Sequence, residues 1–417
     1  MSFCIYGLGS TGESVIKYFK KKNFSDYVTW DDNMKKKGDQ NFFSKNLDLV
    51  DYIILSPGIN LKKAKLKKKL IQNKHKIITD LDLLYLFNPK IKSIVLTGTN
   101  GKSTTCKILE HVLKKNKINV RLGGNIGKPV LDLNLNNKPI VIIEASSFQL
   151  AYSKFVRPDY AAILNITNDH LDWHGSMNNY IKSKFKVFSL QSKKNFAFIN
   201  DKKLIQKYKR NKYLGKLSSA NSKNFIRIKK NIKNDYLNSL ANNENLSFVH
   251  ALSKTLKISD KSFLKSLRSF KGLPHRHEIF LKNKNKVFIN DSKATTFEAS
   301  KFALQNNKNI FWIVGGTPKL GDKFKLAKLK KNIFKSYVIG KYMVNFKNQL
   351  KGKVDFQLCG TLENAVNAVF KSIQKIKNEK LTILFSPAGS SYDQFKNFEE
   401  RGTKFKKLIK SYAKKYA

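Results

Sequence analysis

The stretch IVLTGTNGKSTTCKIL, from Ile94 to Leu109, joins an apolar segment, a turn with two glycines and a helical pattern. The backbone N–H groups of such a turn and the N-terminus of the next helix bind anions. The ending Gly101-Lys102-Ser103 is typical of phosphate-binding loops, but only two residues separate Gly98 from Gly101, whereas the usual loop has four between its glycines. The stretch predicts a phosphate site of an unusual kind, and a plain strand–turn–helix is the alternative.

Short apolar runs alternate with helical patterns along the whole chain of 417 residues. This alternation is typical of α/β layers with mostly parallel sheets, and the length favours two or three domains over one core. Three groups of strand-like segments begin near residues 3, 92 and 286, and the lysine-rich segment 202–234 has only a weak pattern. The sequence therefore predicts an α/β protein of several domains.

The composition, with 41% hydrophobic residues, predicts a globular protein. No apolar run reaches the length of a membrane helix, and the start MSFCIYGLGS does not match a signal peptide. Three widely spaced cysteines suit a reducing compartment. We expect a cytoplasmic protein with no membrane insertion.

The net charge of +52 is compatible with a nucleic-acid-binding ATPase. However, lysines occur throughout the chain and do not gather in one tail or one arginine-rich face. We therefore expect a solvated lysine surface and no specific nucleic acid, with the nucleic-acid-binding ATPase as the alternative from a different class.

Polar residues also follow the next two predicted strands of the second group. Glu144 ends the apolar run VIIE, where an isolated glutamate would be costly unless it were paired or bound to a metal. His170 follows the run AAILNIT, although Mg²⁺ prefers carboxylates and waters and a plain loop histidine is the alternative. Because ligands of open α/β sheets bind at the strand ends, Lys102, Ser103, Glu144 and His170 are expected to converge on one crevice.

The N-terminal segment contains the pattern GLGSTG with Gly7, Gly9 and Gly12, followed by Asp31 and Asp32. Such a pattern is typical of dinucleotide-binding turns. A nicotinamide cofactor would also need a redox site, and the sequence offers no residues for one. The pattern therefore predicts a turn that binds some other phosphate, and LSPGI, around Ser56, is a second turn at a strand end.

The last third contains GLPHR, NDSKAT and SPAGSSYDQFKNFEERG. Arg276 offers a guanidinium that can clamp a phosphate, and Asp291 opens a dense polar turn after a strand. Phe395 and Phe398 are three residues apart, and this spacing by itself favours the core stripe of a helix.

Taken together, GTNGKST, GLPHR, NDSKAT and SPAGSSYDQFKNFEERG resemble the Mur ligases, which build the bacterial cell-wall precursor. The resemblance spans nearly the whole chain in the expected order, and the short GTNGKST loop is the family's own form of the phosphate loop. Within the family, the chain most resembles the branch that adds D-glutamate. It implies an ATP-dependent ligase that joins D-glutamate to UDP-N-acetylmuramoyl-L-alanine through an acyl phosphate. A sister Mur ligase or a folylpolyglutamate-type ligase is the alternative within the shared fold.

The resemblance implies three domains: an N-terminal Rossmann-like domain over residues 1–90 that binds the UDP-substrate, a central ATPase domain over 91–272, and a C-terminal Rossmann-like domain over 273–417 that binds the amino acid. It implies ATP and two Mg²⁺ ions as cofactors, and we expect a monomer. The implied ATP-binding residues are Gly98, Thr99, Asn100, Gly101, Lys102, Ser103, Thr104, Asn242, Asn245, Arg276 and Asp291. The implied substrate-binding residues are Ser10, Thr11, Ser56, Gly58, Asn125, Lys293, Thr295, Lys319, Ser391 and Phe398. Lys102, Glu144, His170 and Lys184 are the implied catalytic residues, and Ser103, Glu144, His170 and Lys184 the implied metal ligands.

Lys184, in YIKSKFKVF, matches a lysine that the family carbamylates, and Phe188 selects it over Lys182 and Lys186. CO₂ adds to an uncharged amine, so burial near cations must lower the pKa of this lysine. One more surface lysine is the alternative.

The chain departs from the family pattern at four positions. Ala241 replaces a histidine, Thr296 replaces an asparagine, and Thr317 and Pro318 alter the loop before Lys319. None of these positions belongs to the phosphate loop or to the implied metal ligands. We therefore expect effects on substrate affinity more than on the class of reaction.

Overall fold

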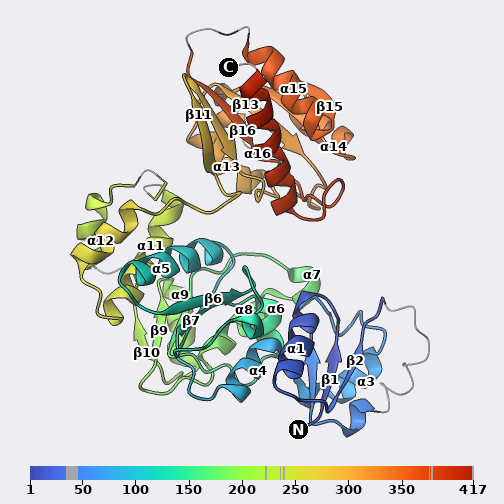
Figure 1. The fold of residues 1–417 in the computed structure, drawn as a ribbon, viewed down its shortest axis with the longest axis vertical. Helices are drawn as coiled ribbons and strands as arrows, with labels where there is room; N and C mark the ends of the chain where they lie inside the picture. Colours follow the sequence, from blue (N-terminus) through green and yellow to red (C-terminus); the bar gives the residue numbers. More distant parts are fainter. Residues whose placement is uncertain are drawn as a thin grey trace. The chain divides into compact units, whose positions relative to one another are not determined.

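The computed structural model describes residues 1–33, 46–220, 223–234, 236–237, 240–325, 327–374, 376 and 379–415. The chain forms two compact units, Met1–Phe270 and Lys271–Ala417 (Figure 1). The first unit contains two sheets and the second contains one. The predicted α/β architecture with mostly parallel sheets is confirmed, whereas the boundary expected after residue 90 stays a prediction because both flanking sheets belong to one unit.

The first sheet has the order β2-β1-β3-β4 and is parallel throughout. Its strands are β1 (Phe3–Tyr6), β2 (Tyr27–Trp30), β3 (Tyr52–Leu55) and β4 (Ile77–Ile78). The accompanying helices are α1 (Ser10–Lys21), α3 (Lys67–Gln72), the 3₁₀ turn η1 (Lys74–Lys76) and α4 (Asp80–Phe87). Helix α4 begins in a capping box in which Thr79 and Asp82 bond each other's backbone, which fixes the point where the chain leaves β4.

The second sheet, also parallel, has the order β10-β9-β8-β5-β7-β6. Its strands are β5 (Ser93–Thr97), β6 (Val120–Gly124), β7 (Ile140–Glu144), β8 (Tyr160–Ile163), β9 (Phe196–Ile199) and β10 (Lys216–Ser218). Strand β5 lies between β7 and β8, so the three strand ends singled out in the sequence are neighbours at one edge of the sheet.

The helices that accompany this sheet include α5, which starts directly after the phosphate loop. They are α5 (Lys102–Lys115), α6 (Ser147–Tyr152), α7 (Leu171–His174), α8 (Met177–Phe185), α9 (Lys202–Arg210), α10 (Lys223–Ile228), α11 (Leu240–Thr255) and α12 (Asp260–Arg268), with 3₁₀ turns η2 (Val130–Asp132), η3 (Lys186–Phe188) and η4 (Lys229–Asn231). The weakly patterned segment 202–234 thus contributes α9, β10 and α10.

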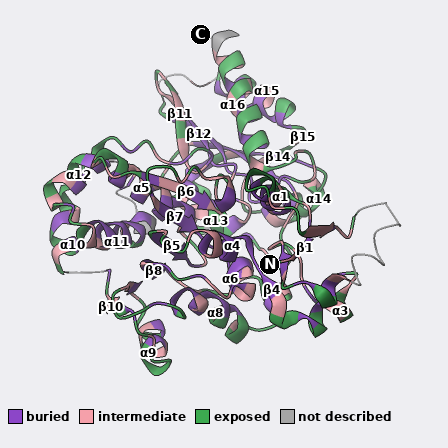
Figure 2. Ribbon diagram, turned by 60° about the horizontal axis from the view of Figure 1, so that its bottom comes forward, coloured by how far each residue is buried: buried purple, intermediate pink, exposed green. Residues whose placement is uncertain are grey.

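One hydrophobic cluster joins the two sheets of the first unit. It includes Phe3 and Phe19 from the first sheet and its helix, Leu84 from α4, and Val95 and Ile143 from the second sheet. Figure 2 shows strands β5 and β7 in purple, the colour of buried residues. This shared core explains why the two sheets form one compact unit.

The second unit has a sheet of order β11-β12-β16-β13-β14-β15, parallel except for the β11–β12 hairpin. Its strands are β11 (Glu278–Asn283), β12 (Lys286–Asn290), β13 (Ile310–Gly315), β14 (Ile333–Ile339), β15 (Phe356–Gly360) and β16 (Leu381–Phe385), and its helices are α13 (Phe297–Gln305), η5 (Ala327–Asn332), α14 (Met343–Leu350), α15 (Leu362–Ile373) and α16 (Phe398–Lys415). Two hydrophobic clusters, one around Phe311 and one around Trp312, cover its opposite faces because side chains alternate along β13.

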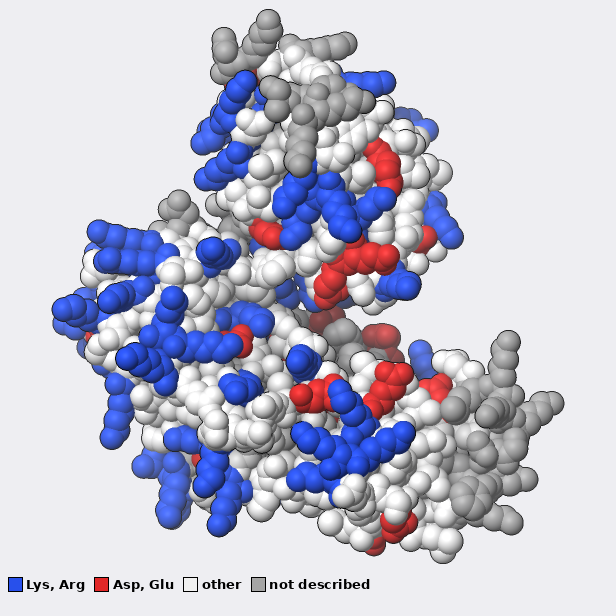
Figure 3. Space-filling model, in the orientation of Figure 1, with Lys and Arg blue, Asp and Glu red and all other residues white. Residues whose placement is uncertain are grey.

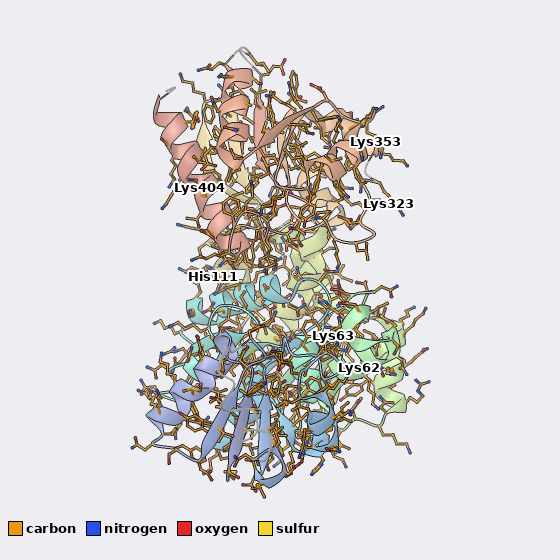
Figure 4. The ribbon with its side chains drawn as sticks, turned by 90° about the vertical axis from the view of Figure 1, so that its right-hand side faces the viewer. Lys62, Lys63, His111, Lys323, Lys353 and Lys404 are labelled. Carbon is orange, nitrogen blue, oxygen red and sulfur yellow. The ribbon has the colours of Figure 1, made fainter. Side chains whose placement is uncertain are left out.

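Lysine and arginine side chains are scattered over the visible face of each unit in Figure 3 and do not form one stripe there. Lys62, Lys63, Lys323, Lys353 and Lys404, labelled in Figure 4, are all exposed. Among the described residues, no helix combines the length and the apolar character that a membrane span requires.

Candidate active site

The predicted phosphate loop connects β5 to α5 and is held by a residue that the sequence did not single out. The backbone N–H groups of Thr99 and Asn100 donate to the carbonyl and the side-chain oxygen of Asn165, both at 2.9 Å. Gly101, which precedes α5, has a left-handed backbone with φ of +81°. Only glycine adopts this conformation at little cost, so the second glycine is required by the turn.

Two lysines converge on the loop. The ammonium of Lys102 donates to the carbonyls of Gly98 and Thr99, both at 2.8 Å, and that of Lys184 donates to the same Gly98 carbonyl at 2.8 Å. The shared carbonyl places the two lysine amino groups side by side where a phosphate would bring negative charge. This arrangement favours the phosphate site over a plain strand–turn–helix.

Lys184 is buried, with only 1% of its surface exposed, so the alternative of a surface lysine is wrong. Its ammonium lies 4.6 Å from the centre of the Tyr180 ring. Burial, and then the charge of Lys102, lowers the pKa of Lys184 to about 6. Phe188, the aromatic residue that selected Lys184 in the sequence, is buried one turn further along and packs against Phe185.

Glu144 ends β7 and is 2% exposed. Its Oε1 atom accepts a hydrogen bond from the side-chain amide of Asn125 at 3.0 Å. Its Oε2 atom is buried and has no hydrogen-bond partner among the described residues. Because an unpaired buried carboxylate oxygen is costly, this atom fits a bound cation.

His170 immediately precedes α7, and 45% of its side chain is exposed. Its ring packs against Phe148 at 4.7 Å, and its Nε2 atom lies 3.4 Å from a carboxylate oxygen of Asp169. No group of three His, Cys, Asp or Glu side chains suited to a metal occurs in the described part of the chain. The predicted metal ligands do not form such a group, because two of them are of other types. One is Ser103, which is buried in the first turn of α5, and the other is the modified Lys184.

The predicted asparagine pair of α11 reaches the loop from the side of α5. The Thr105 hydroxyl donates to Oδ1 of Asn245 at 3.1 Å, and the Asn245 amide donates to Oδ1 of Asn242 at 3.3 Å. The structure thus brings both asparagines to the base of the loop. The side chain of Ala241, one of the departures from the family pattern, lies outside the described residues.

A pocket of about 450 Å³, here called the N-terminal pocket, lies between the first and second sheets of the first unit. All five substrate residues predicted in this unit line it, namely Ser10, Thr11, Ser56, Gly58 and Asn125. Asp31 also lines it and accepts a hydrogen bond from the N–H of Leu8 at 2.7 Å, so this acidic residue braces the glycine turn. Asp80 and Gln149 also line the pocket, and neither was predicted.

In the second unit, Asp291 follows β12 and accepts hydrogen bonds from the Ser386 hydroxyl at 2.7 Å and the His277 N–H at 3.0 Å. Burial raises the pKa of Asp291 to about 7. The Lys293 ammonium lies 3.8 Å from the centre of the Phe398 ring, which is a close cation–π contact. Arg276 is near enough to Asp291 to favour its charged form.

The helix stripe expected from Phe395 and Phe398 is wrong. Helix α16 starts at Phe398, so Phe395 lies in the preceding loop, where it packs at the edge of the core. The ring of Phe398 instead faces Lys293. The deeply buried Arg401, one turn into α16, was missed: it donates to the Ser292 carbonyl at 2.7 Å and thereby ties this helix to the NDSKAT turn.

The remaining predicted residues lie in neighbouring loops of the same unit. Ser391 is buried, whereas Lys319 is exposed beyond the altered loop, in which Thr317 pairs with Ser390. Thr295 is half-buried and follows Lys293 in the polar turn. The departure at Thr296 has a local role, because its hydroxyl accepts the Ala299 N–H and caps α13.

Gly101→Ala is expected to destabilise the loop and weaken ATP binding. The added methyl would lie 2.2 Å from Oδ1 of Asn245, and a left-handed alanine costs about 1–2 kcal/mol in addition. Gly127→Ala is the matched control, because Gly127 has φ of +69° with nothing within 4 Å of the added methyl. Urea unfolding with and without ATP tests this. Equal losses of unfolding free energy and of stabilisation by ATP in both variants would contradict the close approach of Asn245.

Comparisons with known proteins show which family the chain resembles. Residues 96–259 match the model of the Mur ligase middle domain. The chain is 36% identical over 440 residues to the UDP-N-acetylmuramoylalanine--D-glutamate ligase of Rickettsia prowazekii, with 97% of each chain covered. It is 35% identical over 420 residues to the enzyme of that name from Aquifex aeolicus, with 98% of each covered.

Solved structures show the same fold. UDP-N-acetylmuramate-alanine ligase MurC from Thermotoga maritima aligns with a TM-score of 0.61 at 19% identity and 99% coverage of each chain. MurF ligase from Thermotoga maritima, solved in complex with ADP, aligns with a TM-score of 0.59 at 15% identity, covering 100% of this chain and 95% of that one.

Proposed function

The chain belongs to the Mur ligase family, and from this premise we propose that it is an ADP-forming ligase that joins D-glutamate to UDP-N-acetylmuramoyl-L-alanine. The observation that carries the proposal is the 36% identity, over 97% of the chain, to a ligase of that name. The meeting of Lys102, Lys184 and Glu144 around the phosphate loop supports the ATP-dependent half of the reaction. We also propose that the protein is a cytoplasmic monomer.

ATP would bind with its phosphates on the loop from Gly98 to Thr104 and its nucleoside beside Asn242 and Asn245. The loop offers backbone N–H groups, the N-terminus of α5 and the ammonium of Lys102. Lys102 now bonds two loop carbonyls, and on binding it would turn to the β- and γ-phosphates. The resemblance also implies Arg276 and Asp291 as ATP-binding residues, and they remain part of the proposal.

Mg²⁺ is the cation that this site would take, held by Ser103, Glu144, His170 and carbamylated Lys184, and it would neutralise phosphate charge. The unpaired Oε2 atom of Glu144 supports this donor set. A second ion is part of the proposal, because a carbamate on Lys184 would add a negatively charged oxygen donor to the site. The carbamate is supported by the burial of Lys184 and by the effect of Lys102, both of which favour the neutral amine.

In the first step, the L-alanine carboxylate of the substrate attacks the γ-phosphorus. A bond forms between the carboxylate oxygen and phosphorus, the bridge to the β-phosphate breaks, and ADP leaves. Lys102 and the loop N–H groups stabilise the charge on the transferring group, so the contribution of the protein is positioning and electrostatics. In the second step, the amine of D-glutamate attacks the acyl carbon, and phosphate leaves from the tetrahedral intermediate.

An isotope experiment tests this route. Substrate labelled with ¹⁸O in the L-alanine carboxylate should transfer one label to inorganic phosphate for each peptide bond formed, because the carboxylate oxygen stays with phosphorus. Release of unlabelled phosphate during ligation would exclude the acyl phosphate.

Lys293→Ala is expected to raise the KM for D-glutamate by roughly 10- to 100-fold, the loss of a charge-assisted hydrogen bond. Lys293 presents its ammonium beside Phe398, on the turn proposed to bind the acidic amino acid. The KM for ATP should stay near the wild-type value. Lys308→Ala, an exposed lysine of the same unit, is the control. Equal changes in both KM values would place Lys293 in a general structural role.

A further inference from the structure

Asp80 is a buried acid in the N-terminal pocket with no role in the reaction described above. It is the first residue of α4, and its side chain lines the pocket although the residue is only 2% exposed. Among the described residues, no lysine or arginine forms an ion pair with it. A buried carboxylate without a cationic partner is destabilising unless hydrogen bonds compensate it.

Among the described residues, Gln149 is the side chain that hydrogen-bonds this carboxylate, beside backbone N–H groups at the start of α4, and the contact is long. The Gln149 amide nitrogen lies 3.3 Å and 3.5 Å from the two Asp80 oxygens. The amide oxygen of Gln149 accepts from the N–H and the hydroxyl of Ser146, both at 3.1 Å, in the capping box of α6. This box fixes which end of the amide faces Asp80, and a carboxylate with up to four acceptor positions keeps capacity for further donors.

The rest of the pocket shows which part of a ligand Asp80 would meet. Its other wall is the GLGSTG turn and the N-terminus of α1 with Ser10 and Thr11, where positive potential suits phosphate. A carboxylate repels phosphate, so the phosphates and Asp80 must contact different parts of the ligand. Burial raises the pKa of Asp80 to about 6, although hydrogen bonds from Gln149 and from backbone N–H groups at the start of α4 act in the opposite direction.

We propose that Asp80 accepts a hydrogen bond from an O–H or N–H group of the sugar in a nucleoside-diphosphate sugar, and so sets the specificity of this pocket for a sugar nucleotide over the nucleotide alone. The inference rests on the proposed function for the identity of the full substrate. Within the pocket, the diphosphate lies at the start of α1 and the sugar lies toward α4.

Calorimetric titration of the full chain with UDP and with UDP-N-acetylglucosamine tests the proposal. Asp80→Ala should weaken the binding of UDP-N-acetylglucosamine by roughly 10-fold or more, which is the contribution of a hydrogen bond to a charged acceptor. The affinity for UDP should stay unchanged. Asp80→Asn can still accept a neutral hydrogen bond, so its affinity for UDP-N-acetylglucosamine should lie between those of wild type and Asp80→Ala. Asp132→Asn is the control, since Asp132 bonds Ser14 of α1 and does not line the pocket.

Thermal unfolding separates this role from a structural one. Asp80→Asn removes a buried charge without a cationic partner, so its Tm should equal or exceed that of wild type. A lowered Tm with equal weakening of both ligands, or an unchanged ratio of the two affinities in Asp80→Ala, would overturn the proposal. D-glutamate-dependent ADP release by the wild-type chain tests the proposed function separately, because the two titrations need no amino acid.

Discussion

Lys184→Ala is expected to lower the kcat of the ligase by roughly 10²- to 10³-fold, the usual cost of removing a preorganised charged group from an active site. The ammonium of Lys184 donates to the Gly98 carbonyl at 2.8 Å and is almost completely buried. If the carbamate forms, the variant loses an anionic oxygen donor beside the phosphates. Steady-state ADP release measures the effect.

The carbamate itself is tested by rescue. Acetate or propionate added to Lys184→Ala should restore part of the activity, because a small carboxylate can occupy the space of the missing carbamate. Lys182→Ala is the matched control, an exposed lysine on the same helix, and it should retain wild-type activity. Full activity of Lys184→Ala without added acid would exclude any role for a carbamate.

Glu144→Gln should lower kcat by a similar factor of roughly 10²–10³, because it removes the negative charge proposed to hold Mg²⁺. The glutamine oxygen can keep the hydrogen bond from Asn125, so the geometry of the strand end should persist. Raising the Mg²⁺ concentration should recover part of the activity.

Stability distinguishes loss of the metal from loss of the fold. The Oε2 atom of Glu144 is buried without a hydrogen-bond partner among the described residues, so neutralising it should leave Tm unchanged or raise it in the absence of ligands. Glu110→Gln, on α5 but paired with Lys107 and Lys114, should keep its activity. A large fall in Tm for Glu144→Gln would show that the charge has a structural role.

Much of the fold follows from local pattern. The apolar runs of β5, β7 and β8 are buried on both faces, as is typical of strands in a parallel sheet. Because these three strands are neighbours, the sequence pattern correctly predicted that Lys102, Glu144 and the loop that leads to His170 follow adjacent strand ends. Four strands, β6, β10, β11 and β15, were missed. All four are the outermost strands of their sheets and are only partly buried, so they carry little hydrophobic pattern.

The site was less accessible to sequence reasoning. The burial of Lys184 depends on α8 packing against the phosphate loop, and nothing in a lysine-rich chain marks one lysine as buried without the family match. Asn165 and Asp80 act through contacts distant in sequence, with the loop backbone and with Gln149, so no spacing reveals them. Asp80 also shares the first turn of α4 with Asp82, so its acidic character alone does not distinguish it from a helix-capping residue.

The most direct test of the central claim is ADP release by the purified chain with UDP-N-acetylmuramoyl-L-alanine and ATP, compared across single amino acids. We predict turnover with D-glutamate that is at least 10²-fold above that with L-glutamate, L-lysine, L-alanine or diaminopimelate. A site that binds the polar groups of one amino acid rejects amino acids whose groups do not match it by such factors. Turnover with L-lysine or diaminopimelate and none with D-glutamate would contradict the assignment within the family.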